Sequence, residues 1–343
     1  MLRHSIRTRL LVLIVLVAVV PMAFLGYSGY SNNKKFINEK EEEKINFFFT
    51  EIRGMMVKFF NITSRDIAFL RSVVEDHMPN SYENLDENNK KEIENILYNF
   101  SKTNVQYDQV RFLDHEGYEK IRINNNARTI ETVSKEGLQY KGDSYYIEEA
   151  FALMPGEVYI SDIDLNHENG ELEMPLKPVV RYIVPVYIEE KLRGFVALNL
   201  NVGYLLMDIE RRRGQNGYEN MMLFDNHGYY MLNSDKTKEW GCENGLGSGE
   251  NFNKDYTDTG LIEEIFSSEM LTIKDNGSNI LAWRSVELKG LGNRKLAMFL
   301  DISKDKYLQP LASFRNLFMF QVVVSILALI VGGIMIATYL TRP

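Results

Sequence analysis

Residues 107–124, YDQVRFLDHEGYEKIRIN, pass from an apolar run through the turn sequence Asp-x-x-Gly into a second alternating run. An Asp in such a turn can bond to its own backbone and the Gly supplies a positive φ, so the stretch predicts a β-hairpin. A shorter version, LFDNHGY, recurs at 223–229. The repeat predicts two copies of one α+β module.

Each copy continues with a helical stretch and then a second strand pair. The helical stretches are 143–153 and 259–269, and the strand pairs are 181–200 and 279–302. The connections within each strand pair are too short for parallel crossovers, so we expect antiparallel sheets.

A long helix is predicted before the first copy, at 31–79. This range contains one glycine, Gly54, and no proline before Pro79. Its apolar residues follow a 4-3 spacing, interrupted by Asp66, and are Phe48, Ile52, Met55, Phe59, Ile62, Phe69 and Val73. Such a stripe is typical of a parallel dimer seam, and equally of a helix packed on its own sheets.

Two uncharged apolar runs, 10–30 and 317–340, are each long enough to cross the hydrocarbon core as a helix. A cleaved signal peptide would end in an A-x-A-like site, which the first run lacks. Basic residues precede the first run: Arg3, Arg7 and Arg9. We therefore expect a membrane protein with both termini cytoplasmic and 31–316 outside.

Composition excludes several classes of protein. Lys plus Arg number 39 against 47 Asp plus Glu, a net charge of −8 that disfavours nucleic-acid binding. The single cysteine, Cys242, excludes a disulfide framework and a multi-cysteine zinc site. The sequence contains no hydrolase, nucleotide-binding or zinc-protease motif, so we predict no catalytic residue, metal or cofactor. A kinase or cyclase activity would lie in a domain outside these residues.

Arg181 stands within the apolar run VVRYIVPV. A guanidinium inside a sheet needs an anion, because an unpaired buried charge is costly. Strand alternation places Arg181 on the face opposite Tyr182, and Arg111 on the face opposite Phe112. Two interpretations stay open: an internal pair with Asp162, Asp164 or a Glu, or a fork for the carboxylate or phosphate of a ligand.

The tract SDIDLNHENG at 161–170 is similar to a calcium-binding loop, but His167 stands where such a loop requires Gly. A strand that runs into a turn at Asn169-Gly170 is the favoured interpretation.

Three tracts resemble double Cache sensor domains of bacterial transmembrane receptors, in the variety found on sensor histidine kinases. They are 107–124, 144–151 (SYYIEEAF) and 157–186. The resemblance implies an α+β fold in which one long N-terminal helix carries two PAS-like antiparallel-sheet modules, with the ligand in the membrane-distal one.

The expected organisation is a cytoplasmic N-terminus 1–9, a transmembrane helix 10–30, a signalling helix 31–79, a distal module 80–215, a proximal module 216–305, a connector 306–316, a transmembrane helix 317–340, and the start of a HAMP-like cytoplasmic relay 341–343.

The resemblance also suggests site residues. Amino-acid-binding members carry Arg, Trp and Tyr on a helix, then Tyr and Asp downstream. Tyr146 matches the first Tyr, while Tyr145 stands for the Trp and Ser144 for the Arg. Tyr159 and Asp162 match the downstream pair. With the two arginines, the predicted ligand-binding residues are Arg111, Tyr145, Tyr146, Tyr159, Asp162 and Arg181.

The ligand is expected to be a small anionic or zwitterionic molecule; with the family's Arg absent, a dicarboxylate, another organic anion or an amine stay open. The leading hypothesis is a receptor that dimerises, spans the lipid bilayer of the bacterial inner membrane and signals to a histidine kinase. The alternatives are a diguanylate cyclase or chemoreceptor output, or a membrane-tethered scaffold without signalling. The scaffold hypothesis becomes stronger if the natural chain ends near Pro343.

Overall fold

The computed structural model describes residues 6–78, 87–126, 128–168, 170–258 and 260–340, and only the backbone of 6–16, 18, 19 and 336–340. The helices are α1 (Ile6–His77), α2 (Glu87–Thr103), α3 (Tyr145–Ala150), α4 (Gly203–Gln215), α5 (Phe252–Asp255), α6 (Leu261–Ser267), α7 (Lys304–Tyr307) and α8 (Gln309–Leu340), with short 3₁₀ turns η1 (Lys135–Gly137), η2 (Lys236–Lys238) and η3 (Lys289–Leu291). The strands are β1 (Tyr107–Asp114), β2 (Glu119–Asn125), β3 (Ile130–Thr132), β4 (Tyr159–Ile160), β5 (Asp164–Leu165), β6 (His167–Glu168), β7 (Glu171–Leu172), β8 (Pro178–Ile188), β9 (Lys191–Asn201), β10 (Met221–Asp225), β11 (Tyr230–Leu232), β12 (Thr272–Asp275), β13 (Asn279–Leu288) and β14 (Arg294–Ser303).

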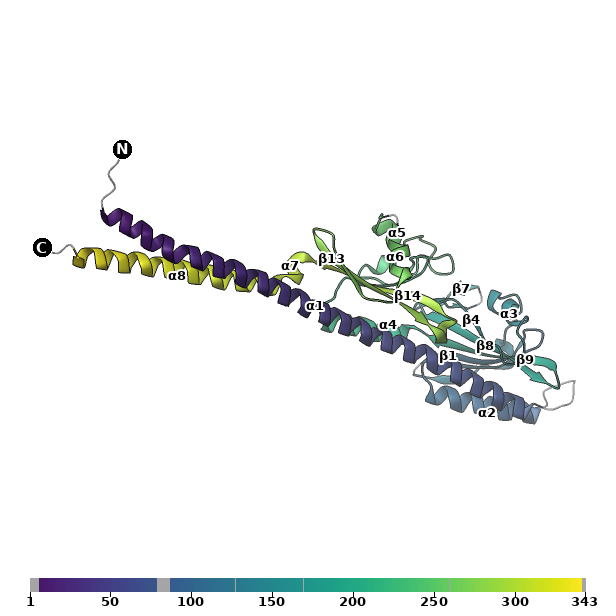
Figure 1. Ribbon diagram of the computed structural model, residues 1–343. Helices are drawn as coiled ribbons and strands as arrows, with labels where there is room; N and C mark the ends of the chain where they lie inside the picture. The colour runs from purple at the N-terminus through teal and green to yellow at the C-terminus, as the bar shows by residue number, and fades with distance from the viewer. Residues whose placement is uncertain (1–5, 79–86, 127, 169, 259, 341–343) are drawn as a thin grey trace. The chain divides into compact units, whose positions relative to one another are not determined.

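The mixed α+β class, the long N-terminal helix and the antiparallel sheets are confirmed. The chain forms two compact units, one of 49–272 with 283–300, the other of the residues up to Phe48, 273–282 and those from Asp301 on. Helix α1 and strands β13 and β14 run through both (Figure 1).

The first sheet has the strand order β3-β2-β1-β9-β8-β4, with β5 also paired to β8. Every neighbouring pair in it is antiparallel. The second sheet has the order β11-β10-β14-β13-β12, and β6 and β7 form a separate hairpin. That hairpin lies in the tract proposed to run as a strand into a turn; Asn169 itself is outside the described residues.

The two Asp-x-x-Gly turns have the same geometry, as predicted. Asp114 Oδ1 accepts the backbone N–H groups of Glu116 (3.0 Å) and Tyr118 (2.9 Å). Asp225 Oδ1 accepts those of His227 and Tyr229, both at 2.9 Å. The glycines that follow have φ of +92° and +86°, the left-handed region in which a side chain would be strained.

Within 49–77, helix α1 buries Ile52 of the predicted stripe and, from Met56 on, a stripe one residue beyond it: Met56, Phe60, Thr63, Ile67, Leu70 and Val74. Asp66, which interrupts the predicted stripe, accepts a hydrogen bond from the Tyr107 hydroxyl of β1 (2.5 Å). Burial and this carboxylate raise the pKa of Tyr107. The predicted stripe residue Phe69 is 56% exposed. The 4-3 pattern therefore contains two neighbouring faces, and only one packs against the chain itself.

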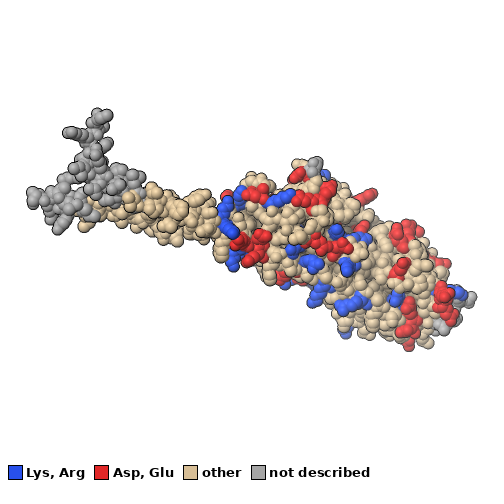
Figure 2. Space-filling model, viewed as in Figure 1, with Lys and Arg blue, Asp and Glu red and all other residues tan. Residues whose placement is uncertain are grey.

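In the other unit, α1 and α8 run side by side (Figure 1): the ring of Phe318 lies against Gly26, where no Cβ would fit. Among the described residues, one helix, Gln309–Met335, is long and apolar enough to cross a membrane by length and composition. Residues 17–33 of α1 and 316–335 of α8 contain no Lys, Arg, Asp or Glu, and the face of these helices seen in Figure 2 is uncharged there. The predicted first span lies in α1, but the side chains of 6–16 are outside those described, so that span stays a prediction.

Candidate ligand-binding site

The strand register brings a polar set of side chains to one face of the first sheet. Arg181 on β8 pairs with Asn199 on β9, and Asn199 pairs with Gln109 on β1. Since directly opposite residues of antiparallel strands point to the same face, these three and Arg111 share it, as alternation predicted. Val110, Phe112 and Tyr182 are buried on the opposite face.

Arg181 is 4% exposed and pairs with an internal carboxylate. Its Nη1 donates to Asp164 Oδ1 at 2.6 Å, and its Nη2 donates to Asn166 Oδ1 at 3.3 Å. The Tyr145 hydroxyl donates to the other Asp164 oxygen at 2.6 Å. Of the three partners foreseen for an internal pair, Asp164 is therefore the one in contact.

Arg111 is 1% exposed and incompletely bonded. Its Nη2 donates to Asn199 Oδ1 at 2.6 Å, and its Nη1 lies 3.5 Å from Glu119 Oε1. Its Nε is buried without a hydrogen-bond partner among the described residues. An unsatisfied buried N–H is costly, and it commonly marks a place where water or a ligand belongs.

Tyr146 lies beside both guanidinium groups. It is the second residue of α3, and its ring centroid is 4.7 Å from Arg181 Cζ and 5.8 Å from Arg111 Cζ. Burial by itself raises the pKa of this phenol, but Arg111, Arg181 and Lys141 outweigh it and lower the pKa to about 8. This field stabilises negative charge at the hydroxyl of Tyr146.

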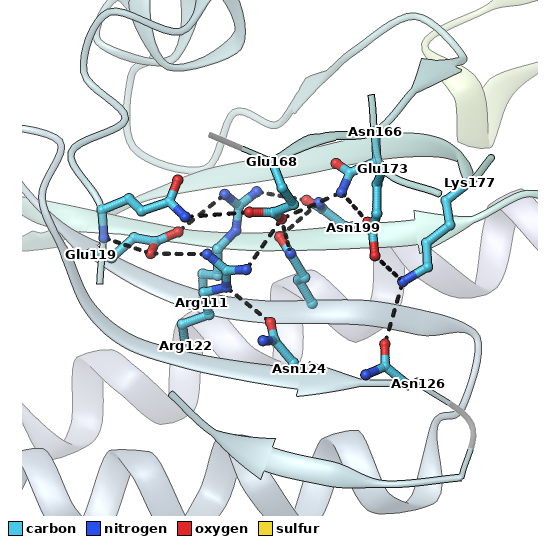
Figure 3. Close-up of polar contacts among 12 residues, drawn as sticks. Arg111, Glu119, Arg122, Asn124, Asn126, Asn166, Glu168, Glu173, Lys177 and Asn199 are labelled. Atoms are coloured by element: carbon cyan, nitrogen blue, oxygen red, sulfur yellow. Dashed lines mark hydrogen bonds and ion pairs between the residues drawn. The ribbon is translucent and has the colours of Figure 1, made fainter. Parts of the chain in front are cut away.

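Beyond Arg111, Glu168 joins a network of polar side chains around the hairpin of β6 and β7 (Figure 3). Glu168 accepts from Gln109 Nε2 (2.6 Å) and Gln139 Nε2 (3.3 Å), and its Oε1 lies 3.2 Å from Arg122 Nη2. Burial raises the pKa of Glu168. The positive charge of Arg122 and the hydrogen bond from Gln109 help to outweigh burial, so the net shift of the pKa is downward.

The buried charges of this face balance. Arg111 and Arg122 both contact Glu119, Arg122 also contacts Glu168, and Arg181 contacts Asp164. Three guanidiniums thus meet three carboxylates. Because removal of one charge would leave its partner buried and unpaired, the set is a coupled unit.

The structure brings together four predicted site residues, places Tyr159 beside them and turns Asp162 away. Arg111, Tyr145, Tyr146 and Arg181 meet beneath α3. Tyr159 pairs with Ile183 and packs beside the apolar cluster next to them. Asp162 turns away: its Oδ1 accepts from Arg294 Nε of β14 at 2.8 Å.

Sequence reasoning missed Glu119, Arg122, Glu168 and Asn199. A signal existed for Arg122, which lies directly opposite Arg111 in the hairpin and so shares its face. It also existed for Asn199, a polar residue in an apolar strand. No sequence signal identified Glu119 or Glu168. Glu119 lies beyond a bulge in the pairing of β1 with β2, and Glu168 belongs to the separate hairpin of β6 and β7.

The corresponding face of the second sheet is aromatic. The turns are offset by 111 residues, so Met222 stands where the first sheet has Arg111. Met222 pairs with Phe299, which packs against Phe252 (5.0 Å) and Tyr256 (4.9 Å). One sheet therefore buries a charged network where its counterpart buries stacked rings.

The sequence pattern of the bacterial histidine kinase sensor domain matches residues 63–289. The chain therefore belongs to the family of bacterial histidine kinase sensor domains. No curated protein matches it in sequence.

Solved structures share the fold. The extracellular domain of a histidine kinase, vpHK1S-Z8, is 21% identical with a TM-score of 0.62 over 82% of this chain and 96% of that one. A domain of a sensory box/GGDEF family protein from Vibrio parahaemolyticus is also 21% identical, with a TM-score of 0.62 over 79% and 98%. The sensory domain of the Campylobacter jejuni chemoreceptor Tlp3, with isoleucine bound, is 12% identical, with a TM-score of 0.55 over 80% and 97%.

Proposed function

We propose that this chain is the extracytoplasmic ligand-sensing region of a transmembrane receptor, with its ligand in the distal module, 80–215. The observation that carries this is the pair of buried guanidiniums beside Tyr146, one of them with an Nε that has no partner in the described part of the chain. The proximal module, 216–305, has aromatic rings in the corresponding place. A buried cluster of positive donors suits a small anionic or zwitterionic molecule.

The ligand's negative group would take the place of Asp164 on Arg181. The buried charges already balance without a ligand. An added anion must therefore displace one of the carboxylates or share an arginine with it. Asp164 belongs to a two-residue strand, β5, and Glu168 to a two-residue hairpin strand, so both sit on short elements that can shift. Tlp3, in which isoleucine and L-valine were seen, supports a zwitterionic ligand through likeness of fold.

Signal transmission would run through the membrane. The proposed spans are 10–30 and 317–340, with both termini in the cytoplasm, 31–316 outside and a histidine kinase as output. The apolar helix at Gln309–Met335 and the sensor-domain family support this arrangement. The residues 341–343 proposed to open a HAMP-like relay lie outside the described part of the chain.

A parallel homodimer would form along α1. The half-exposed or exposed apolar side chains beside the buried stripe supply a seam for it: Met55, Phe59, Ile62, Phe69 and Val73. A ligand that prefers one arrangement of the two helices would shift the receptor between states.

The test is thermal stabilisation of the full chain, purified in lipid nanodiscs, by acetate, succinate, inorganic phosphate and L-valine. At least one of them should raise the melting temperature of the wild type. Arg181→Gln should weaken that ligand ~10- to 150-fold, the effect of losing a charge-assisted pair. Asp164→Asn should tighten it, because the competing carboxylate is gone.

If none of the four stabilises the wild type, and both variants merely lower the melting temperature, Arg181 serves only its internal ion pair. If a ligand stabilises the wild type and Arg181→Gln alike, the ligand binds elsewhere and the site is wrongly placed.

A further inference from the structure

A cavity of about 540 Å³ lies beside the turn that follows β10, and of the buried ion pairs of the distal network only Asp164 lines it. One wall consists of Asp162 and Ile163, which join β4 to β5, and of Asp164, the first residue of β5. The other walls come from 225–231, 240–244 and 291–296 of the second sheet and its loops. Its volume is within the range of small-molecule sites, and such sites favour places where two sheets or domains meet.

Three aromatic residues are among those that line this cavity, Tyr229, Tyr230 and Trp240, and the ring of Tyr230 packs on Phe224 in the core of the second sheet. Trp240 is 6% exposed and has a φ of +60°, a conformation that a bulky residue rarely adopts. Its backbone is held on both sides: its N–H donates to Tyr230 O (2.8 Å), and its carbonyl accepts from the Leu246 N–H (2.7 Å). Strain of this kind persists where the surroundings over-determine it.

The charge of the lining is negative after its ion pairs are counted. Asp164 is paired with Arg181 and Asp162 with Arg294. This leaves two carboxylates, Asp225 and Glu243, against one cation, Lys295.

Asp225 is the carboxylate best placed to bind a ligand. Its Oδ1 accepts the two backbone N–H groups of the turn, and it forms no ion pair within the described chain. Burial raises its pKa, and Asp162 adds to this effect. Burial also raises the pKa of the half-buried Cys242 thiol, and Asp225 raises it further. Burial disfavours charge of either sign, but the contributions of Asp162 and Asp225 show a negative field, which disfavours added negative charge and favours a cation.

We propose that this cavity is a second binding site, centred on Asp225 and bordering the distal site at Asp164, and that it takes a small organic cation. The ammonium group would lie against Asp225, and the rings of Tyr229 and Trp240 would contribute cation–π attraction. Recognition of quaternary ammonium groups by aromatic cages uses the same two contributions.

Cys242 provides a direct measurement, because it lines the cavity and is the only cysteine. The full chain in nanodiscs of phosphatidylglycerol is treated with a thiol reagent, and the rate of modification is followed at constant ionic strength. The probes are choline, tetramethylammonium and 1,4-diaminobutane, with 3,3-dimethylbutan-1-ol as the uncharged analogue of choline. At least one cation should slow the modification saturably, while the alcohol should act far more weakly.

Two turn variants locate the effect. Asp225→Asn keeps the Oδ1 acceptor of the turn but removes the charge, so the half-protecting concentration should rise at least about tenfold. Asp114→Asn changes the equivalent turn of the first sheet and should leave protection unchanged. Absence of protection by all three cations overturns the proposal, as does equal protection by the alcohol. Unchanged protection in Asp225→Asn also overturns it. None of these outcomes depends on Arg181.

Discussion

Asp162 and Asp164 stand two residues apart in the chain, yet their carboxylates bind arginines of different sheets. Asp164 accepts from Arg181 of the first sheet at 2.6 Å, and Asp162 accepts from Arg294 of the second at 2.8 Å. Arg294 also donates to the Ile160 carbonyl at 2.9 Å. A ligand that moves Asp164 would therefore pull on a segment attached to β14.

The two pairs should differ in their effect on stability. Asp164→Asn leaves Arg181 buried without a carboxylate, so we expect it to lower the free energy of unfolding by ~3 kcal/mol or more. Asp162→Asn breaks a pair whose carboxylate side chain is 77% exposed, so its cost should stay below about 1 kcal/mol. Thermal unfolding of the two full-length variants, followed by circular dichroism, makes the comparison. Equal losses would contradict the buried pairing.

Strand alternation predicted the shared face of Arg111 and Arg181, because a period of two depends only on the strands being there. It could not separate Asp162 from Asp164, since both have the same parity. What separates them is that β4 ends at Ile160 and β5 begins at Asp164, so Asp162 lies in neither strand.

The long helix shows a similar limit. A 4-3 spacing does not distinguish two stripes that lie one residue apart, and only the packing of the sheet shows which of them is buried. The aromatic core of the second sheet was likewise hidden from sequence reasoning, because Phe252 and Tyr256 lie in and directly after α5, far from β10 in sequence.

Tyr146 should ionise well below an ordinary tyrosine. With its pKa lowered to about 8, one tyrosine should titrate near that pH in an ultraviolet difference spectrum, and Tyr146→Phe should abolish this step. A depressed folded-state pKa contributes stability that is complete above the unfolded value, near 10, and is lost as pH falls toward 8. As the pH rises from about 8 to about 10, the free energy of unfolding of the wild type should therefore increase relative to that of Tyr146→Phe. A flat difference would contradict the placement of Tyr146 between two guanidiniums.

The proposed orientation is tested through Cys242, which 31–316 would place outside the cytoplasm. A small membrane-impermeant thiol reagent should label it once the outer envelope is permeable and mild denaturant has opened its half-buried site. The control is Cys242→Ser, which should give no signal. Labelling that requires rupture of the inner membrane would place the domain in the cytoplasm and contradict the orientation.

The dimer prediction is sharpest at adjacent positions of α1. Phe69 is exposed on the face beside the buried stripe, and Ala68, also exposed, lies ~100° further round the helix. In a Cys242→Ser background, Phe69→Cys in membranes should form same-position disulfide crosslinks much faster than Ala68→Cys. Both side chains are accessible and they are consecutive in the chain, so random collisions of receptors should crosslink them at similar rates. A difference between the two crosslinking rates therefore reports a defined dimer seam. Leu70→Cys, buried within the chain, should not crosslink. Equal rates at 68 and 69 would mean that the exposed stripe is not a dimer face.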